Sequence, residues 1–69
     1  MKYYNVSVVG SPLNSQFIVE GNTTKKEFKQ WFNENYGSTI ARIKEVDRAE
    51  IDPIWALYLA QTDNGLKLV

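Results

Sequence analysis

The segment 24–37 constrains the fold more than any other part of the chain, because it is the clearest helix. Thr24 and Glu27 have the spacing of a capping box, in which each side chain accepts a hydrogen bond from the backbone amide of the other. Gly37 stands where a helix end favours a residue with positive φ. Apolar side chains recur at helical spacing along one side: Phe28, Trp31, Phe32 and Tyr36. This aromatic stripe predicts a helix over residues 24–36 whose apolar side is covered by the rest of the chain.

The segment before this helix has the pattern of a β-hairpin. Residues 2–9 and 15–20 alternate between two sets of side chains and are rich in β-branched and aromatic residues, as strands are. Residues 10–14 contain a glycine, a proline and an asparagine, which favour a turn. The short connection predicts that the two strands are antiparallel.

Residues 38–47 are ambiguous between helix and strand. Ile40, Ile43 and Val46 are spaced by three, which suits a helix. We favour a strand, because a helix has just ended at Gly37 and two strands need further partners to make a stable sheet. A β-bulge would reconcile the spacing with a strand. Residues 48–53 are polar and are expected to connect this segment to the next.

Residues 54–61 are ambiguous in the same way. Asp52-Pro53 is a good helix start, but residues 54–60 carry no charge, and a small domain has little room for a helix buried on all sides. We favour a strand with Trp55, Leu57 and Leu59 inward. Residues 62–65 contain Asn-Gly, which predicts a tight turn into a last short strand over residues 66–69.

The predicted fold is therefore a single α+β domain over residues 1–69. One antiparallel sheet packs on one helix, in the order strand, strand, helix, strand, strand, strand. A chain of 69 residues buries only about 60% of its extended surface, so the predicted core is thin.

The predicted helix resembles a known one. Residues 28–35 (FKQWFNEN), after an N-terminal hairpin that opens with Met-Lys-Tyr, resemble the helix of the antibody-binding domain of protein G. That family folds as hairpin, helix, hairpin, so the resemblance implies a protein G-like, β-grasp topology. The tail is longer in this chain, and no functional residue is carried over.

The C-terminal part resembles a second family. Residues 53–57, with Asp63-Asn64-Gly65 and Leu68, are similar to the final hairpin of the phage inhibitors of uracil-DNA glycosylase. Those inhibitors are strongly acidic DNA mimics, whereas this chain has eight basic and eight acidic residues. The resemblance therefore implies the hairpin alone, and no functional residue is carried over.

The composition argues against several kinds of site. The chain has no cysteine and no histidine, so it lacks thiolate ligands, the commonest metal ligand and the commonest general base at neutral pH. The carboxylates of residues 45–52 have neither the spacing nor the glycine of a calcium loop, and we interpret them as a solvated connection. We expect a non-catalytic protein without a metal or cofactor.

The chain also lacks the patterns of membrane proteins and secreted proteins. Its longest apolar run, residues 54–60, is far shorter than the roughly 20 residues that span a bilayer. The N-terminus has no continuous apolar segment of the kind found in a signal peptide. We therefore expect a cytoplasmic protein.

The leading functional hypothesis is a protein–protein interaction module. A sheet covered by one helix leaves its other face open, and apolar patches on small domains often mark partner sites. The candidate partner-binding residues on that face are Tyr3, Ile18, Ile40 and Tyr58. The partner is a host protein or a second copy of the chain. The size and the composition suit a small phage or mobile-element accessory protein that inhibits or redirects a host protein.

The alternative hypothesis is a single-stranded nucleic-acid-binding protein. Tyr3 and Tyr58 would stack on bases while basic side chains contact phosphates. The candidate phosphate-binding residues are Lys25, Lys26, Lys29, Arg42 and Lys44. The zero net charge favours the protein-binding hypothesis over this one.

Overall fold

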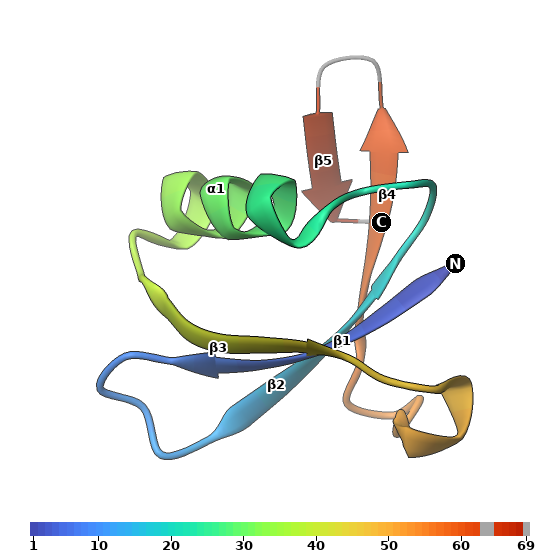
Figure 1. The fold of residues 1–69 in the computed structure, drawn as a ribbon, viewed down its shortest axis with the longest axis horizontal. Helices are drawn as coiled ribbons and strands as arrows, with labels where there is room; N and C mark the ends of the chain where they lie inside the picture. Colours follow the sequence, from blue (N-terminus) through green and yellow to red (C-terminus); the bar gives the residue numbers. More distant parts are fainter. Residues whose placement is uncertain (63–64, 69) are drawn as a thin grey trace.

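In the computed structural model of the chain, which describes residues 1–62 and 65–68, one helix lies across one face of a five-stranded sheet (Figure 1). The elements in order are β1 (Lys2–Val8), β2 (Asn14–Val19), α1 (Lys25–Tyr36), β3 (Ile40–Glu45), the 3₁₀ helix η1 (Arg48–Glu50), β4 (Leu57–Thr62) and β5 (Gly65–Leu68). The prediction of a small α+β domain with one helix and one sheet is confirmed.

Both ends of α1 have the predicted geometry. The amide of Glu27 donates to the Thr24 hydroxyl at 3.2 Å, and the amide of Thr24 donates to the Glu27 carboxylate at 3.4 Å, which completes the capping box. Gly37 has a φ of 66°, and its amide donates to the carbonyl of Asn33 at 2.9 Å. A side chain with a Cβ is disfavoured at this φ, so the glycine ends the helix where the sequence predicts.

The sheet is mixed, so the prediction of a purely antiparallel sheet is wrong. Its spatial order is β3-β1-β2-β4-β5, and the β2–β4 pair is parallel, with Phe17 opposite Leu57 and Val19 opposite Leu59. β1 has neighbours on both sides, β2 and β3, and β4 lies on the free side of β2. The chain reaches this position through residues 46–56, and a connection that crosses the sheet, unlike a tight hairpin, joins strands that run in the same direction. The hairpin–helix–hairpin arrangement implied by the protein G resemblance also fails, because β3 follows the helix and pairs with β1.

A β-bulge in β3 explains the ambiguous spacing of its isoleucines. Ser7 lies opposite Arg42 and Val8 lies opposite Ile40, so two steps along β3 match one step along β1. The extra residue brings Ile40 and Ile43 to the same side of the sheet, where Ile40 is buried and Ile43 packs against the core. The predicted strand is confirmed, but the prediction that Ile40 lies on the face away from the helix is wrong.

The strand predicted over residues 54–61 begins later, at Leu57. The amides of Trp55 and Ala56 both donate to the carbonyl of Asp52 at 3.1 Å, so Asp52-Pro53 starts a single turn before the strand. Trp55 lies in this turn and is 76% exposed, so the prediction that it points inward is wrong. The predicted turn at residues 62–65 lies partly outside the described residues, at 63–64, as does the final residue 69 of the predicted last strand.

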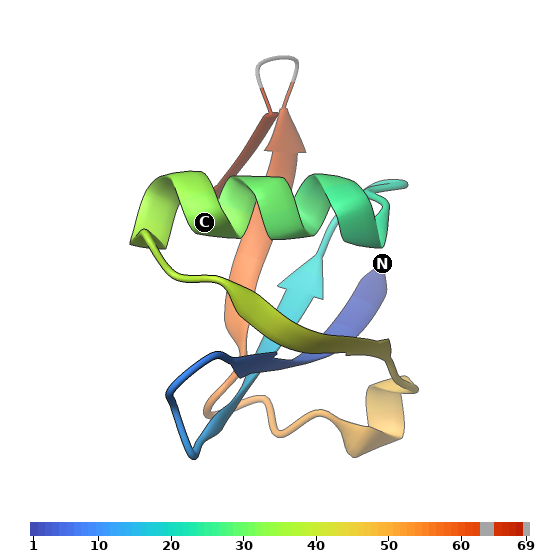
Figure 2. The same ribbon diagram turned by 60° about the vertical axis from the view of Figure 1, so that its left-hand side comes forward.

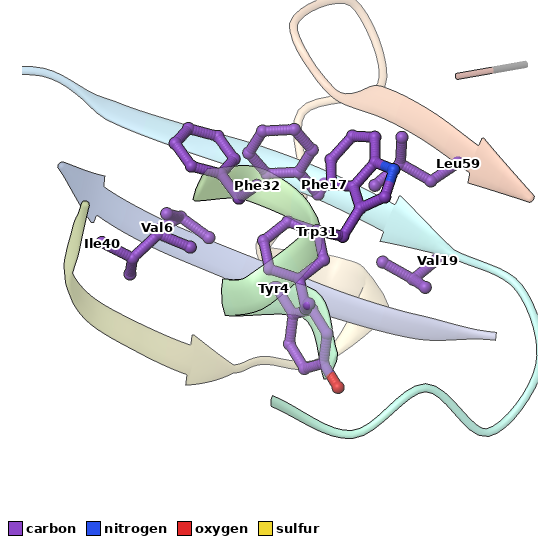
Figure 3. Packing of buried hydrophobic residues seen from close by; sticks show 9 residues of the cluster. Tyr4, Val6, Phe17, Val19, Trp31, Phe32, Ile40 and Leu59 are labelled. Carbon is purple, nitrogen blue, oxygen red and sulfur yellow. The ribbon is translucent and has the colours of Figure 1, made fainter. Parts of the chain in front are cut away.

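The core is an aromatic layer between α1 and the sheet (Figure 3). The ring centroid of Phe28 lies 5.3 Å from that of Tyr4 and 5.1 Å from that of Phe17. Phe32 makes an edge-to-face contact with Phe17 at 5.8 Å. The other buried hydrophobic side chains are Val6, Val19, Trp31, Ile40 and Leu59. All the apolar stripe residues of the predicted helix except Tyr36 are thus buried against the sheet.

The residues that join β3 to β4 cross the other face of the sheet (Figure 2). We call residues 46–56 the crossing segment. The side-chain amide of Gln16 on β2 donates to the carbonyl of Glu50 at 3.1 Å and accepts from the amide of Asp52 at 2.9 Å. These two bonds attach the crossing segment to the middle of the face opposite α1.

Trp31→Ala is expected to lower the free energy of unfolding by about 3–5 kcal/mol, because it removes a buried ring. It also removes the hydrogen bond that the indole N–H donates to the carbonyl of Leu66 on β5. Urea denaturation measures the change, with Lys29→Ala on the exposed side of the helix as the control. A loss below about 1 kcal/mol would show that this ring is not part of the core.

Candidate functional site

Three of the four predicted partner-binding residues lie in one row on the face opposite α1. Ile18 on β2 lies opposite Tyr3 on β1 and opposite Tyr58 on β4, so the row runs across three neighbouring strands. All three side chains are half-buried. Ile40 lies on the helix side of the sheet and is separated from the row by the sheet itself. The alternation of side chains along the strands therefore predicted correctly that these three residues share a face.

The crossing segment covers part of this row. Ile51 and Pro53 line the same hollow as Tyr3, Ile18 and Tyr58. The expectation of an open face therefore holds only in part. The cause is the sheet order: β3 and β4 lie on opposite sides of the β1–β2 hairpin, and the chain between them must pass over the hairpin.

The polar end of Tyr58 is already engaged within the chain. Its hydroxyl donates to the carboxylate of Glu20 and lies 4.0 Å from the sulfur of Met1. The hydrogen bond to Glu20, together with partial burial, raises the pKa of the Tyr58 hydroxyl above its ordinary value. The carboxylate favours the protonated phenol, so the Tyr58 hydroxyl is a hydrogen-bond donor. This bond holds the ring in place, and the ring is therefore not free to stack on a base, as the nucleic-acid hypothesis requires.

The five basic candidates for phosphate binding lie on two different sides of the sheet. Arg42 and Lys44 on β3 lie opposite Ser7 and Asn5, on the face away from the helix. The other three lie on α1, which covers the opposite face, and all are exposed: Lys25, Lys26 and Lys29. The fold therefore does not gather the five into one basic surface.

Several exposed apolar side chains lie near Trp55, in the same groove or next to it in the sequence. Ile54 is 81% exposed and Trp55 is 76% exposed, both in the turn before β4. Leu13 in the β1–β2 turn is 73% exposed, and Leu57 at the start of β4 is 43% exposed. Leu13, Trp55 and Leu57 line one open groove of about 620 Å³, and its polar lining includes Asn14, Gln16 and Asp52. We call Leu13, Ile54, Trp55 and Leu57 the Trp55 cluster.

The Trp55 cluster is not predicted from the sequence, because the uncharged run 54–60 favours a strand that begins at Ile54 and has Trp55 and Leu57 inward. A signal was present in Asp52-Pro53. The Asp52 carboxylate accepts from the amide of Ile54 at 3.0 Å, which is the turn that an aspartate before a proline favours. That turn holds Ile54 and Trp55 out of the strand and out of the core.

Among residues 1–62 and 65–68, no group of three or more His, Cys, Asp or Glu side chains is placed to hold a metal ion. In the same residues, no helix has the length and the apolar character needed to cross a membrane. Comparison with protein-family models, curated proteins and solved structures finds no match for the chain.

Glu20→Gln is expected to lower the pKa of Tyr58 toward its ordinary value of 10.0, because the neutral amide no longer opposes the phenolate charge. The raised pKa stabilises the fold below the pKa of the unfolded chain, and this contribution is lost as the pH rises through the folded value. Ultraviolet titration of tyrosinate, with Tyr58→Phe to assign the step, measures the shift. Glu34→Gln is the control, and an equal shift in both variants would contradict the assignment.

Proposed function

We propose that the chain is a non-catalytic protein-binding module and that its partner docks on the Trp55 cluster. The observation that carries the proposal is the position of Trp55. A domain this small has few large apolar side chains for its core, yet this ring is held in the solvent, in one groove with Leu13 and Leu57 and next in sequence to the exposed Ile54.

Three properties of the cluster support the proposal. Tryptophan is enriched among the residues that dominate binding energy at protein interfaces. The carbonyl and the carboxylate of Asp52 both accept hydrogen bonds from the turn that carries Trp55, so the ring is presented on a fixed backbone and less ordering entropy is lost on binding. Polar groups of Asn14, Gln16 and Asp52 border the apolar side chains, as at the rim of an interface.

The Trp55 cluster is a better candidate than the predicted row of Tyr3, Ile18 and Tyr58. The row is half-buried, the crossing segment lies over part of it, and the Tyr58 hydroxyl is bonded to Glu20. A partner would gain less newly buried apolar area there than on the Trp55 cluster, in which Leu13, Ile54 and Trp55 are more than 70% exposed.

Trp55→Ala is expected to abolish partner capture while changing the free energy of unfolding by about 0.5 kcal/mol or less, since the ring makes little contact within the fold. Tagged wild-type and variant chains are passed through a lysate of the native host, and the retained proteins are identified by mass. Leu13→Ser is expected to weaken the same capture. Tyr58→Ala is the matched variant on the sheet face and is expected to retain it.

Capture by Trp55→Ala at the wild-type level, with loss in Tyr58→Ala, would place the site on the sheet face and contradict the proposal. The salt dependence separates the two functional hypotheses. Retention on an apolar surface is expected to persist from low to physiological salt, whereas binding to nucleic acid falls steeply over that range.

A further inference from the structure

Strand β3 forms one end of the sheet, so it pairs with β1 along one side only. The amide of Val46 donates to a β1 carbonyl at 2.9 Å. Because hydrogen-bonded residues alternate along an antiparallel pair, the backbone groups of Lys44 and Arg42 also face β1. The amide and carbonyl groups of Ile43 and Glu45 therefore point away from β1, toward the open side of the sheet.

The opposite end of the sheet differs from β3 in its backbone contacts. There the carbonyl of Leu66 on β5 accepts a hydrogen bond from the Trp31 indole N–H, so the helix contributes a side chain to that strand. No side chain of the described residues bonds in this way to the backbone of Ile43 or Glu45 on β3. Strand β3 is therefore the edge whose unpaired backbone amide and carbonyl groups can pair with another strand.

The side chains of β3 have a charge pattern that selects what can pair with it. Arg42 and Lys44 both lie on the face away from the helix, and both are exposed. Within the part of the chain that the structure describes, neither makes an ion pair. Ile43 lies between them on the helix side and packs against the core. The edge thus presents two unpaired positive charges, two residues apart, on one face.

This pattern opposes pairing between two copies of β3. In an antiparallel pair with two-fold symmetry centred on Ile43, Arg42 of one copy lies directly opposite Lys44 of the other. Centring the pair on Arg42 or on Lys44 places identical positive charges opposite each other. Like charges at directly opposed positions destabilise a strand pair, so a second copy is not the occupant that this edge favours.

We propose that the β3 edge binds an extended acidic segment of a partner protein as a sixth, antiparallel strand. Acidic residues at alternate positions lie opposite Arg42 and Lys44, and a β-branched residue between them lies opposite Ile43. Main-chain bonds to Ile43 and Glu45 provide affinity, and the charge pairs fix the register. This surface is separate from the Trp55 cluster, so the inference does not depend on the proposed function.

The test uses a blocked peptide, Lys-Glu-Val-Glu-Thr, whose antiparallel register places its glutamates opposite Lys44 and Arg42. Its first lysine then lies opposite Glu45. Amide hydrogen exchange of the full chain is followed by NMR as the peptide is added. The expected result is slower exchange at the amides of Ile43 and Glu45, with those of Arg42 and Lys44 already protected. An N-methylvaline peptide, which lacks the central donor, is expected to give no protection.

The charge contribution is tested with matched variants. Arg42→Ser combined with Lys44→Ser is expected to weaken peptide binding by about tenfold, which corresponds to two cross-strand charge pairs. Lys67→Ser removes a positive charge from β5 at the other end of the same sheet face and is expected to leave the affinity unchanged. Trp55→Ala is also expected to bind the peptide as the wild type does.

The inference is overturned if the peptide gives no saturable protection of Ile43 and Glu45. It is also overturned if a peptide with lysines in place of both glutamates binds as tightly, or if the protected amides lie on β5 instead.

Discussion

The packing of one aromatic helix on one face of the sheet determines the rest of the structure. Phe28 of α1 contacts the rings of Tyr4 and Phe17, which belong to the two strands of the first hairpin, so the helix fixes that hairpin as the centre of the sheet. The remaining strands can join only at its two sides. With β3 on one side and β4 on the other, the chain must cross the second face, and the turn that ends this crossing carries Trp55 into solvent.

Elements governed by local signals were predictable from the sequence. The helix, its capping box and its glycine end follow from residues at most four positions apart, and the structure has them where they were predicted. Alternation also predicted the first hairpin. The strands β3 and β4 were predicted on other grounds, namely the need of a two-stranded hairpin for further partners and the absence of charge in residues 54–60. The pairing of these strands depends on contacts between residues far apart in the sequence, and no local pattern distinguishes a parallel β4 from an antiparallel one.

The positions of the candidate site residues were predictable only where the regular alternation of side chains along a strand decides which face a residue is on. Tyr3, Ile18 and Tyr58 share a face as predicted, because each lies in a strand with regular pairing. Ile40 lies on the other side, because a bulge shifts the alternation by one residue. The crossing segment and the Trp55 cluster depend on the sheet order, which no local pattern gives. A strand over residues 54–61 predicts Trp55 inward, whereas Trp55 lies in a turn before the strand and is exposed.

The two tryptophans lie in opposite environments: Trp31 is part of the core, and Trp55 is exposed on the surface that we propose as the docking site. Hydrogen exchange of the two indole N–H groups, followed by NMR on the unmodified chain, tests this difference most directly. The N–H of Trp31 donates to the carbonyl of Leu66 and is expected to exchange slowly. That of Trp55 is expected to exchange at the rate of free indole, with Trp55→Phe assigning the signals. Equal protection of both groups would contradict a buried Trp31 and an exposed Trp55.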